Sequence, residues 1–209
     1  MLYLPQSIRE RYEVHSFHHA EEVLGTGFPG ELGDIIEALS RFSLRTAALL
    51  VGGGNESSIP KQFSELLRPR GWEETSLSGD LVIRTTTHSK KTARTQEATI
   101  PEYLAGHRID YVKNRVALDV EWNSKDQTFD RDLYAFRAFQ EAGIISVGVV
   151  ITRSESLNRV FESLGILHKY GASTTWMGKL LYRLKAGRAG GCPVLIIGIT
   201  PSIVEDWSS

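Results

Sequence analysis

The segment from Val116 to Ile151 constrains the fold most strongly, because the patterns of a strand, a helix and a buried strand follow one another within it. Val116–Trp122 alternates strictly, with large apolar side chains on one face and Ala, Asp and Glu on the other. Apolar residues at helical spacing follow Asp130, and Ile144–Ile151 is a continuous apolar run typical of a strand buried on both faces. This order predicts a βαβ unit with parallel strands.

The rest of the chain extends this unit into an α/β layer architecture. Further helices are predicted at Gly30–Leu50, Pro60–Arg68, Glu155–Leu164 and Met177–Lys185, a loop at Gly52–Asn55 and a last buried strand at Pro193–Ile199. No repeat or low-complexity segment divides the sequence. We therefore expect residues 1–209 to form a single domain.

The composition excludes several classes of protein. With 209 residues, of which 41% are hydrophobic, the chain can bury a core, so neither disorder nor a fibrous repeat fits. Its single cysteine cannot form an intramolecular disulfide, no apolar run approaches the ~20 residues that span a membrane, and Met1–Glu10 lacks the pattern of a secretory leader. We expect a soluble cytoplasmic protein with no membrane partner. A net charge of −1 argues against a polycationic nucleic-acid coat but permits a locally basic groove.

Three acidic residues are predicted to converge on one patch of sheet. Asp119 and Glu121 project from the same face of their strand at a spacing of ~7 Å. Asp110 precedes the turn-like triplet Lys113–Arg115, so pairing of the two flanking strands would bring it to the same patch. Three crowded anions repel one another unless a cation lies between them, and a few carboxylates with open water positions suit Mg²⁺ better than Zn²⁺. The chemistry predicted is hydrolysis of a phosphodiester, although an Asp-x-Glu pair alone is more often a solvated outer face.

A second polar segment is a candidate for contact with DNA. Thr85–Gln96 is rich in β-branched and basic residues and contains Lys90, Lys91 and Arg94. It is either a flexible, solvated loop or an arm that contacts phosphates, and the sequence leaves both interpretations open.

The residues around the acids, from Ile109 to Trp122 (IDYVKNRVALDVEW), resemble the active-site hairpin of PD-(D/E)XK nucleases. More narrowly, they are similar to type II restriction endonucleases of the BglII and BstYI kind. The similarity continues in the same order through 60–67, 70–75, 181–188 and 193–201. It implies a PD-(D/E)XK nuclease core with a central mixed β-sheet flanked by helices. It also implies Mg²⁺-dependent cleavage of double-stranded DNA at a short palindrome with a GATC centre, by a symmetric homodimer.

The resemblance gives each acid a role. Asp110 takes the position of the first metal-binding acid, Asp119 that of the bridging acid, and Glu121 that of the Lys of the wider superfamily. BglII-like enzymes usually have Glu and Gln at the positions of Asp119 and Glu121, so this chain departs from the pattern at both. BamHI also has Glu in the Lys position, so the change is compatible with cleavage. Three negative charges favour two divalent ions, or Glu121 acts as a base toward the attacking water.

The resemblance also implies two loops that read DNA. Asn123, Ser124 and Lys125 follow the catalytic strand; Asn can pair with adenine and Lys can donate to guanine. Ser173, Thr174 and Thr175 occupy the place of a second recognition loop. The alternative for both segments is an ordinary polar turn.

Two other functions stay open from the sequence alone. A repair or structure-selective nuclease would use the same metal chemistry on a different DNA substrate. A non-catalytic DNA-binding protein would keep the acids as structural residues, and the departures at Asp119 and Glu121 are the main support for that alternative.

Overall fold

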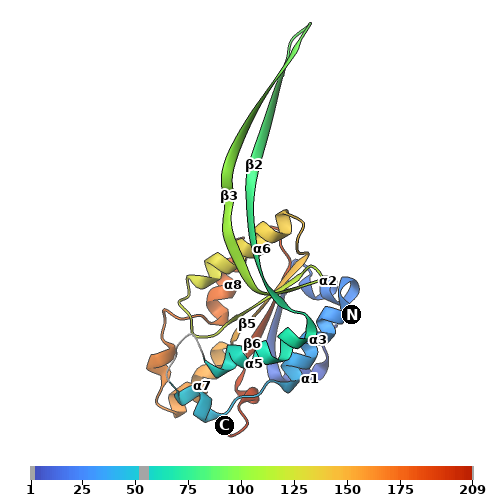
Figure 1. Ribbon diagram of the computed structural model, residues 1–209. Coiled ribbons are helices and arrows are strands. Elements are labelled where there is room, and N and C mark those ends of the chain that lie inside the picture. Colours follow the sequence, from blue (N-terminus) through green and yellow to red (C-terminus); the bar gives the residue numbers. More distant parts are fainter. Residues whose placement is uncertain (1–2, 52–56, 209) are drawn as a thin grey trace.

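A six-stranded mixed β-sheet forms the centre of the protein in the computed structural model, which describes residues 3–51 and 57–208 (Figure 1). The strand order is β1-β6-β5-β4-β3-β2. Strands β4, β5 and β6 are parallel, whereas β1, β3 and β2 pair antiparallel to their neighbours. The strands are β1 Tyr12–Phe17, β2 Glu73–His88, β3 Ala93–Lys113, β4 Val116–Glu121, β5 Val147–Arg153 and β6 Val194–Ile199. The predicted α/β fold with a central mixed sheet flanked by helices is confirmed.

Helices connect the strands and cover both faces of the sheet. They are α1 Gln6–Arg11, α2 Ala20–Gly27, α3 Pro29–Arg41, α4 Thr46–Leu50, α5 Ser58–Leu67, α6 Thr128–Glu141, α7 Asn158–Ser163 and α8 Met177–Lys185, with 3₁₀ turns η1 Arg68–Arg70, η2 Glu155–Leu157, η3 Leu167–Tyr170 and η4 Pro201–Ile203. The bounds predicted for α8 are confirmed. In the described residues no helix has both the length and the apolar character needed to cross a membrane.

The helix predicted at Gly30–Leu50 was wrong in its extent. The structure has two helices there, α3 and α4, because the backbone between them leaves helical geometry. Leu44 pairs instead with Val204, and its N–H donates to the carbonyl of Ile203 at 3.0 Å. The predicted loop at Gly52–Asn55 lies outside the described residues.

Alternation along β4 divides its side chains between two hydrophobic clusters. Val116, Leu118 and Val120 pack on the face covered by α1, α2, α3, α5 and α7. Ala117 packs on the opposite face, with phenylalanines of α6 and with α8. Asp119 shares this second face, and every residue of β4 is buried. The acids of β4 therefore lie under a helix, which excludes the solvated outer face considered from the sequence.

The segment Thr85–Gln96 forms the outer end of a long β-hairpin and not a loop. Strands β2 and β3 remain paired as far as His88 and Ala93, and a short turn over residues 89–92 connects them. Figure 1 shows this hairpin projecting far beyond the body of the protein. The β-branched threonines of the segment favour an extended backbone, which accounts for the strands. The hairpin therefore places its basic side chains far from the body of the protein (Figure 1).

Candidate active site

A tight hairpin between β3 and β4 brings two of the three predicted acids together. Asn114 and Arg115 have positive φ values of 43° and 73°, as a two-residue hairpin turn of this hand requires. The register that follows pairs Tyr111 with Leu118 and sets Asp110 beside Asp119. The backbone N–H of Asp110 donates to Oδ1 of Asp119 at 2.8 Å. Local turn geometry thus determines how the two acids meet.

Asp119 and Glu121 are buried carboxyl groups without sufficient hydrogen-bond donors. Their exposed fractions are 3% and 6%, and within residues 3–51 and 57–208 Oδ2 of Asp119 and Oε2 of Glu121 have no hydrogen-bond partner. Burial and the nearby carboxyl group of Asp132 raise the pKa of both groups, that of Glu121 to about 8. Such groups are costly to bury unless a cation or further donors compensate them.

Asp110 differs from these two acids because its side chain is exposed at the surface of the sheet. Loss of water from part of its surroundings and repulsion by Glu74 still raise its pKa. Asp110 and Glu121 line the same cleft, which has a volume of about 400 Å³ and also contains Asn123, Ser124 and Tyr170. The cleft therefore joins candidate metal-binding acids to candidate base-reading residues.

A second cleft of about 390 Å³ adjoins the first and shares Ser57, Pro60 and Asp110 with it. Lys61, Arg68, Ser64 and Tyr111 line it, and the guanidinium of Arg68 lies 4.8 Å from the centre of the Tyr111 ring. Adjoining clefts with acids in one and basic side chains in the other suit a bound phosphate backbone, since cations attract phosphates and the acids can hold a metal ion against them.

The region also contains a carboxyl group that was not predicted from the sequence, that of Asp132. Asp132 on α6 is 2% exposed, contacts Arg131 at 3.0 Å and raises the pKa values of both Asp119 and Glu121. Burial raises its own pKa to about 6. A signal was available, because Asp132 lies between Phe129 and Phe136 at helical spacing and is the acidic member of an otherwise apolar face.

The donor set of this region fits a divalent cation. Carboxylate oxygens are the ligands that Mg²⁺ prefers, and three of them, on Asp119, Glu121 and Asp132, lack partners in the part of the chain that the structure describes. Across the described ranges, no three His, Cys, Asp or Glu side chains already stand in a geometry that would hold a metal ion. The unpartnered oxygens are the structural evidence for the fit, and side-chain adjustment on binding is required to complete the site.

The two predicted recognition loops form one hydrogen-bonded element. The N–H of Ser124 donates to the hydroxyl of Thr175 at 3.1 Å, and the N–H of Thr175 donates to the carbonyl of Ser124 at 2.8 Å. Lys125 and Thr174 form an isolated antiparallel bridge. The N–H of Asp126 also donates to the carbonyl of Ser173 at 2.9 Å. The loop after β4 is thereby fixed to the loop before α8.

Individual residues of this paired element differ in what they can reach. Lys125 and Ser173 are exposed, and Asn123 and Ser124 are half-buried in the cleft wall. Thr175 is fully buried and its hydroxyl is engaged by Ser124, so the prediction that it reaches DNA does not agree with its position. Thr175 instead holds the two loops together.

The hydroxyl of Thr174 is engaged as well, by a residue that the sequence analysis did not select. Arg153, at the end of β5, is 1% exposed and donates to Thr174 Oγ1 at 2.7 Å and to the carbonyl of Tyr170 at 3.0 Å. Its guanidinium lies 5.7 and 5.6 Å from the centres of the Phe161 and Tyr170 rings, which stack on each other at 3.8 Å, and burial lowers its pKa to about 10. A sequence signal was present, because a charged arginine stands two positions after the continuous apolar run Ile144–Ile151.

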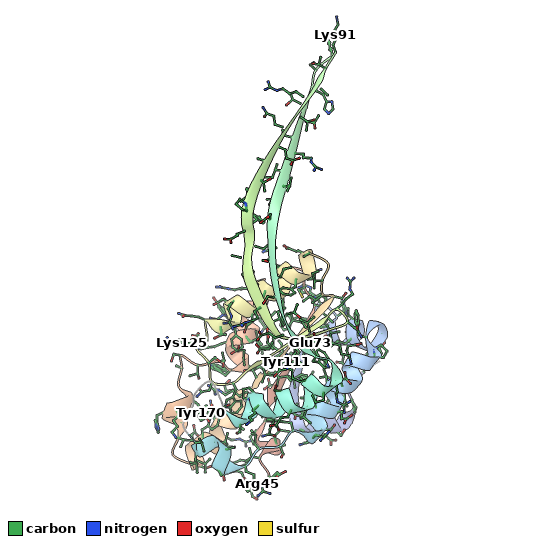
Figure 2. The ribbon with its side chains drawn as sticks, viewed as in Figure 1. Arg45, Glu73, Lys91, Tyr111, Lys125 and Tyr170 are labelled. Carbon is green, nitrogen blue, oxygen red and sulfur yellow. The ribbon has the colours of Figure 1, made fainter. Side chains whose placement is uncertain are left out.

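The basic residues of the hairpin are not part of the cleft. Lys90, Lys91 and Arg94 are exposed near its end, and Figure 2 shows Lys91 at the tip, whereas Lys125 belongs to the body. Contact with a DNA that occupies the cleft would require the duplex to extend along the hairpin. The structure thus separates these three residues from the acids.

Comparison with known proteins assigns the chain to a family. The family model described as restriction endonuclease BglII/BglIII matches residues 12–199, which begin with the first residue of β1 and end with the last residue of β6. No curated protein matches the chain. The match includes the β3–β4 hairpin, the acids and both paired loops. Because it covers most of the sequence, the chain belongs to the BglII/BglIII family of restriction endonucleases.

Proposed function

We propose that this protein is a Mg²⁺-dependent type II restriction endonuclease that hydrolyses phosphodiester bonds of double-stranded DNA at a short palindrome. Membership of the family supports a site-specific nuclease acting on DNA. The observation that carries the proposal is the shared cleft, in which Asp110 and Glu121 face the same space as Asn123 and Ser124. Residues suited to metal binding and residues suited to base contacts are thereby directed at one ligand.

Asp110, Asp119 and Glu121 are the residues that would hold Mg²⁺. A bound Mg²⁺ supplies polarisation of the scissile phosphate and lowers the pKa of a bound water. Asp119 is fixed by the N–H of Asp110, so its free Oδ2 keeps a constant direction. Glu121 lies on the same strand, β4, and lines the same cleft as Asn123.

Sequence recognition is assigned to the paired loops and electrostatic contact to the hairpin. Asn123, Ser124, Lys125 and Ser173 are the candidates for contact with base edges in the major groove, with Thr174 and Thr175 shaping the loop that carries them. Lys90, Lys91 and Arg94 contact phosphates of flanking DNA, which adds affinity without sequence preference. A GATC centre for the palindrome follows the resemblance to BglII-like enzymes.

A symmetric homodimer is the form that we propose cuts both strands. A two-fold assembly presents one copy of the cleft to each strand of a palindrome. Light scattering of the protein with and without a duplex of the cleaved sequence tests this assembly. A mass of two chains supports it, and a single chain on each duplex contradicts it.

Digestion of defined DNA tests the proposed activity. Purified protein with Mg²⁺ is expected to give discrete plasmid fragments whose mapped ends share one palindrome, and Asp119→Ala is expected to bind the same DNA without cutting it. A smear of products on intact duplex would favour a repair or structure-selective nuclease. DNA binding without cleavage or metal binding in the unchanged protein would favour a non-catalytic DNA-binding protein.

A further inference from the structure

Helix α6 places the carboxyl group of Asp132 against the acids of β4. Its Oδ1 accepts a hydrogen bond from Arg131, but its Oδ2 is buried without a partner among the described residues. The carboxyl group of Glu121 lies within hydrogen-bonding reach, and its Oε2 is likewise buried and unpartnered. Two carboxylates cannot donate hydrogen bonds to each other. The two carboxyl groups therefore need a proton or a cation between them.

A buried acid elsewhere in the chain shows how a purely structural carboxylate is stabilised. Glu21 is 5% exposed, and its Oε1 accepts from the N–H groups of Tyr3 and Leu4 at 2.7 and 2.9 Å. Both of its oxygens also contact Arg9, and these donors together lower its pKa. Asp132 and Glu121 lack donors of this number, so their burial has a different explanation.

The local balance of charge also calls for cations. Four carboxyl groups gather here, from Asp110, Asp119, Glu121 and Asp132. Arg131 lies 3.0 Å from Asp132 and 3.9 Å from Glu121, but its side chain is 67% exposed and thus well screened by water. Arg68 and Arg108 also lower the pKa of Asp110, so the shortage of positive charge concerns the buried carboxyl groups of Asp119, Glu121 and Asp132.

We propose that Asp132 is a further ligand of the cation site, and that its Oδ2 and the Oε2 of Glu121 bind a second divalent ion, separate from the ion held by Asp110 and Asp119. This inference rests on the proposed function, because it adds a ligand to the same site. Carboxylate oxygens from two secondary-structure elements are suitable ligands for a hard divalent cation, with waters completing its coordination. A second ion in this place would neutralise the two carboxylates that the protein leaves without donors.

Counting bound Mn²⁺ tests the proposal directly. The full-length protein without DNA is titrated with Mn²⁺, and free Mn²⁺ is measured by electron paramagnetic resonance. We expect two ions per chain in the unchanged protein and one in Asp132→Asn, which keeps the size and an acceptor for Arg131. The matched control is Asp130→Asn on the same helix, whose carboxylate binds Arg183 and Arg188 at 3.0 and 2.7 Å. Equal numbers of ions in Asp132→Asn and the unchanged protein would overturn the proposal.

Thermal unfolding provides a second readout that a structural role would not produce. In EDTA above about pH 8, where both carboxyl groups are ionised, Asp132→Asn is expected to melt at a higher temperature than the unchanged protein, because one of two repelling carboxylates is gone. Saturating Mn²⁺ should raise the melting temperature of Asp132→Asn by less than it raises that of the unchanged protein. A lower melting temperature in EDTA together with an unchanged Mn²⁺ response would identify Asp132 as structural and overturn the proposal. If Asp132→Asn does not fold, Glu121→Gln is titrated in its place and should also lose one ion.

The outcomes separate this inference from the proposed function. One Mn²⁺ per chain in the unchanged protein, with Mg²⁺-dependent cleavage retained, would overturn the role of Asp132 alone. No binding of Mn²⁺ together with no cleavage in Mg²⁺ would overturn both.

Discussion

The backbone N–H of Asp110 donates a 2.8 Å hydrogen bond to Oδ1 of Asp119, across the turn that joins β3 to β4. This bond leaves only Oδ2 of Asp119 free, and it joins two candidate metal ligands through the backbone of one of them. Since the turn at Asn114–Arg115 determines the register, the relative position of the two acids depends on a short local segment.

Asp119→Asn is expected to abolish cleavage and to stabilise the protein in the absence of metal. The amide oxygen can still accept from Asp110, while removal of a carboxyl group whose raised pKa opposes folding at neutral pH should raise the free energy of unfolding by about 1 kcal/mol or more. Cleavage assays and urea unfolding in EDTA measure the two effects. Asp110→Asn is the comparison, because its exposed side chain should change activity with little change in stability.

Stability without metal should fall as the pH rises from about 4.5 to about 8. The pKa of Glu121 is raised from 4.5 to about 8, so the folded state binds more protons than the unfolded state in this window. The stabilisation that Glu121 contributes is fully present below its pKa in the unfolded state. It is lost as the pH rises through its pKa in the folded state. Urea unfolding from pH 5 to 9 in EDTA measures the slope.

Glu121→Gln supplies the control for this pH dependence. The variant has no proton to release, so its stability should vary less between pH 5 and 8 and should exceed that of the unchanged protein at pH 8. Saturating Mg²⁺ should stabilise the unchanged protein most at alkaline pH, where the carboxylates are ionised. A pH dependence that is the same in both proteins would contradict this assignment of the raised pKa.

Thr175→Val is expected to destabilise the protein by about 1–2 kcal/mol, because the N–H of Ser124 then loses its buried acceptor. DNA affinity should fall as well, since the paired loops are less ordered. Ser173→Ala is the matched comparison, with an exposed hydroxyl on the same loop. Ser173→Ala should leave the melting temperature unchanged and weaken binding only to the recognised sequence. If instead Ser173→Ala destabilised the protein and Thr175→Val only weakened specific binding, the roles given to the two hydroxyl groups would be wrong.

Replacing Lys90, Lys91 and Arg94 together by Ala should weaken DNA binding uniformly across sequences. If all three contact phosphates, the slope of log affinity against log salt falls by about 3, and the melting temperature stays unchanged because the side chains are exposed. Affinity is measured in Ca²⁺ over a series of salt concentrations. The control is Arg84→Ala with Glu97→Ala, an ion pair of the same hairpin at 2.7 Å, whose loss leaves the net charge unchanged.

The centre of the sheet could be predicted from the sequence because its signals are local. The alternation in β4 and the apolar run of β5 depend on which side chains face the core, and the structure has both strands. The continuous helix predicted at Gly30–Leu50 failed because Leu44 pairs with Val204, a distant residue that no local pattern reports. Propensity alone could not place that interruption.

The acids show the same division between local and distant information. Asp110 and Asp119 could be predicted to meet because nine positions and one tight turn separate them. The contribution of Asp132 was missed, because helical periodicity indicates which face of α6 is buried but not which strand residues that face contacts. The inward position of Thr175 was missed for the same reason, since its acceptor role depends on Ser124, a residue far away in the sequence.

The short distance along the chain between Glu121 and Asn123 has a consequence for fidelity. Glu121 ends β4, and Asn123, with a φ of 55°, turns the chain into the loop that Thr175 anchors. A wrong base pair that displaces this loop would also displace the carboxylate of Glu121, because only Trp122 separates Glu121 from the loop. Binding to a wrong DNA sequence would then also move a catalytic group out of place. Discrimination between DNA sequences would therefore appear in the rate of cleavage as well as in affinity.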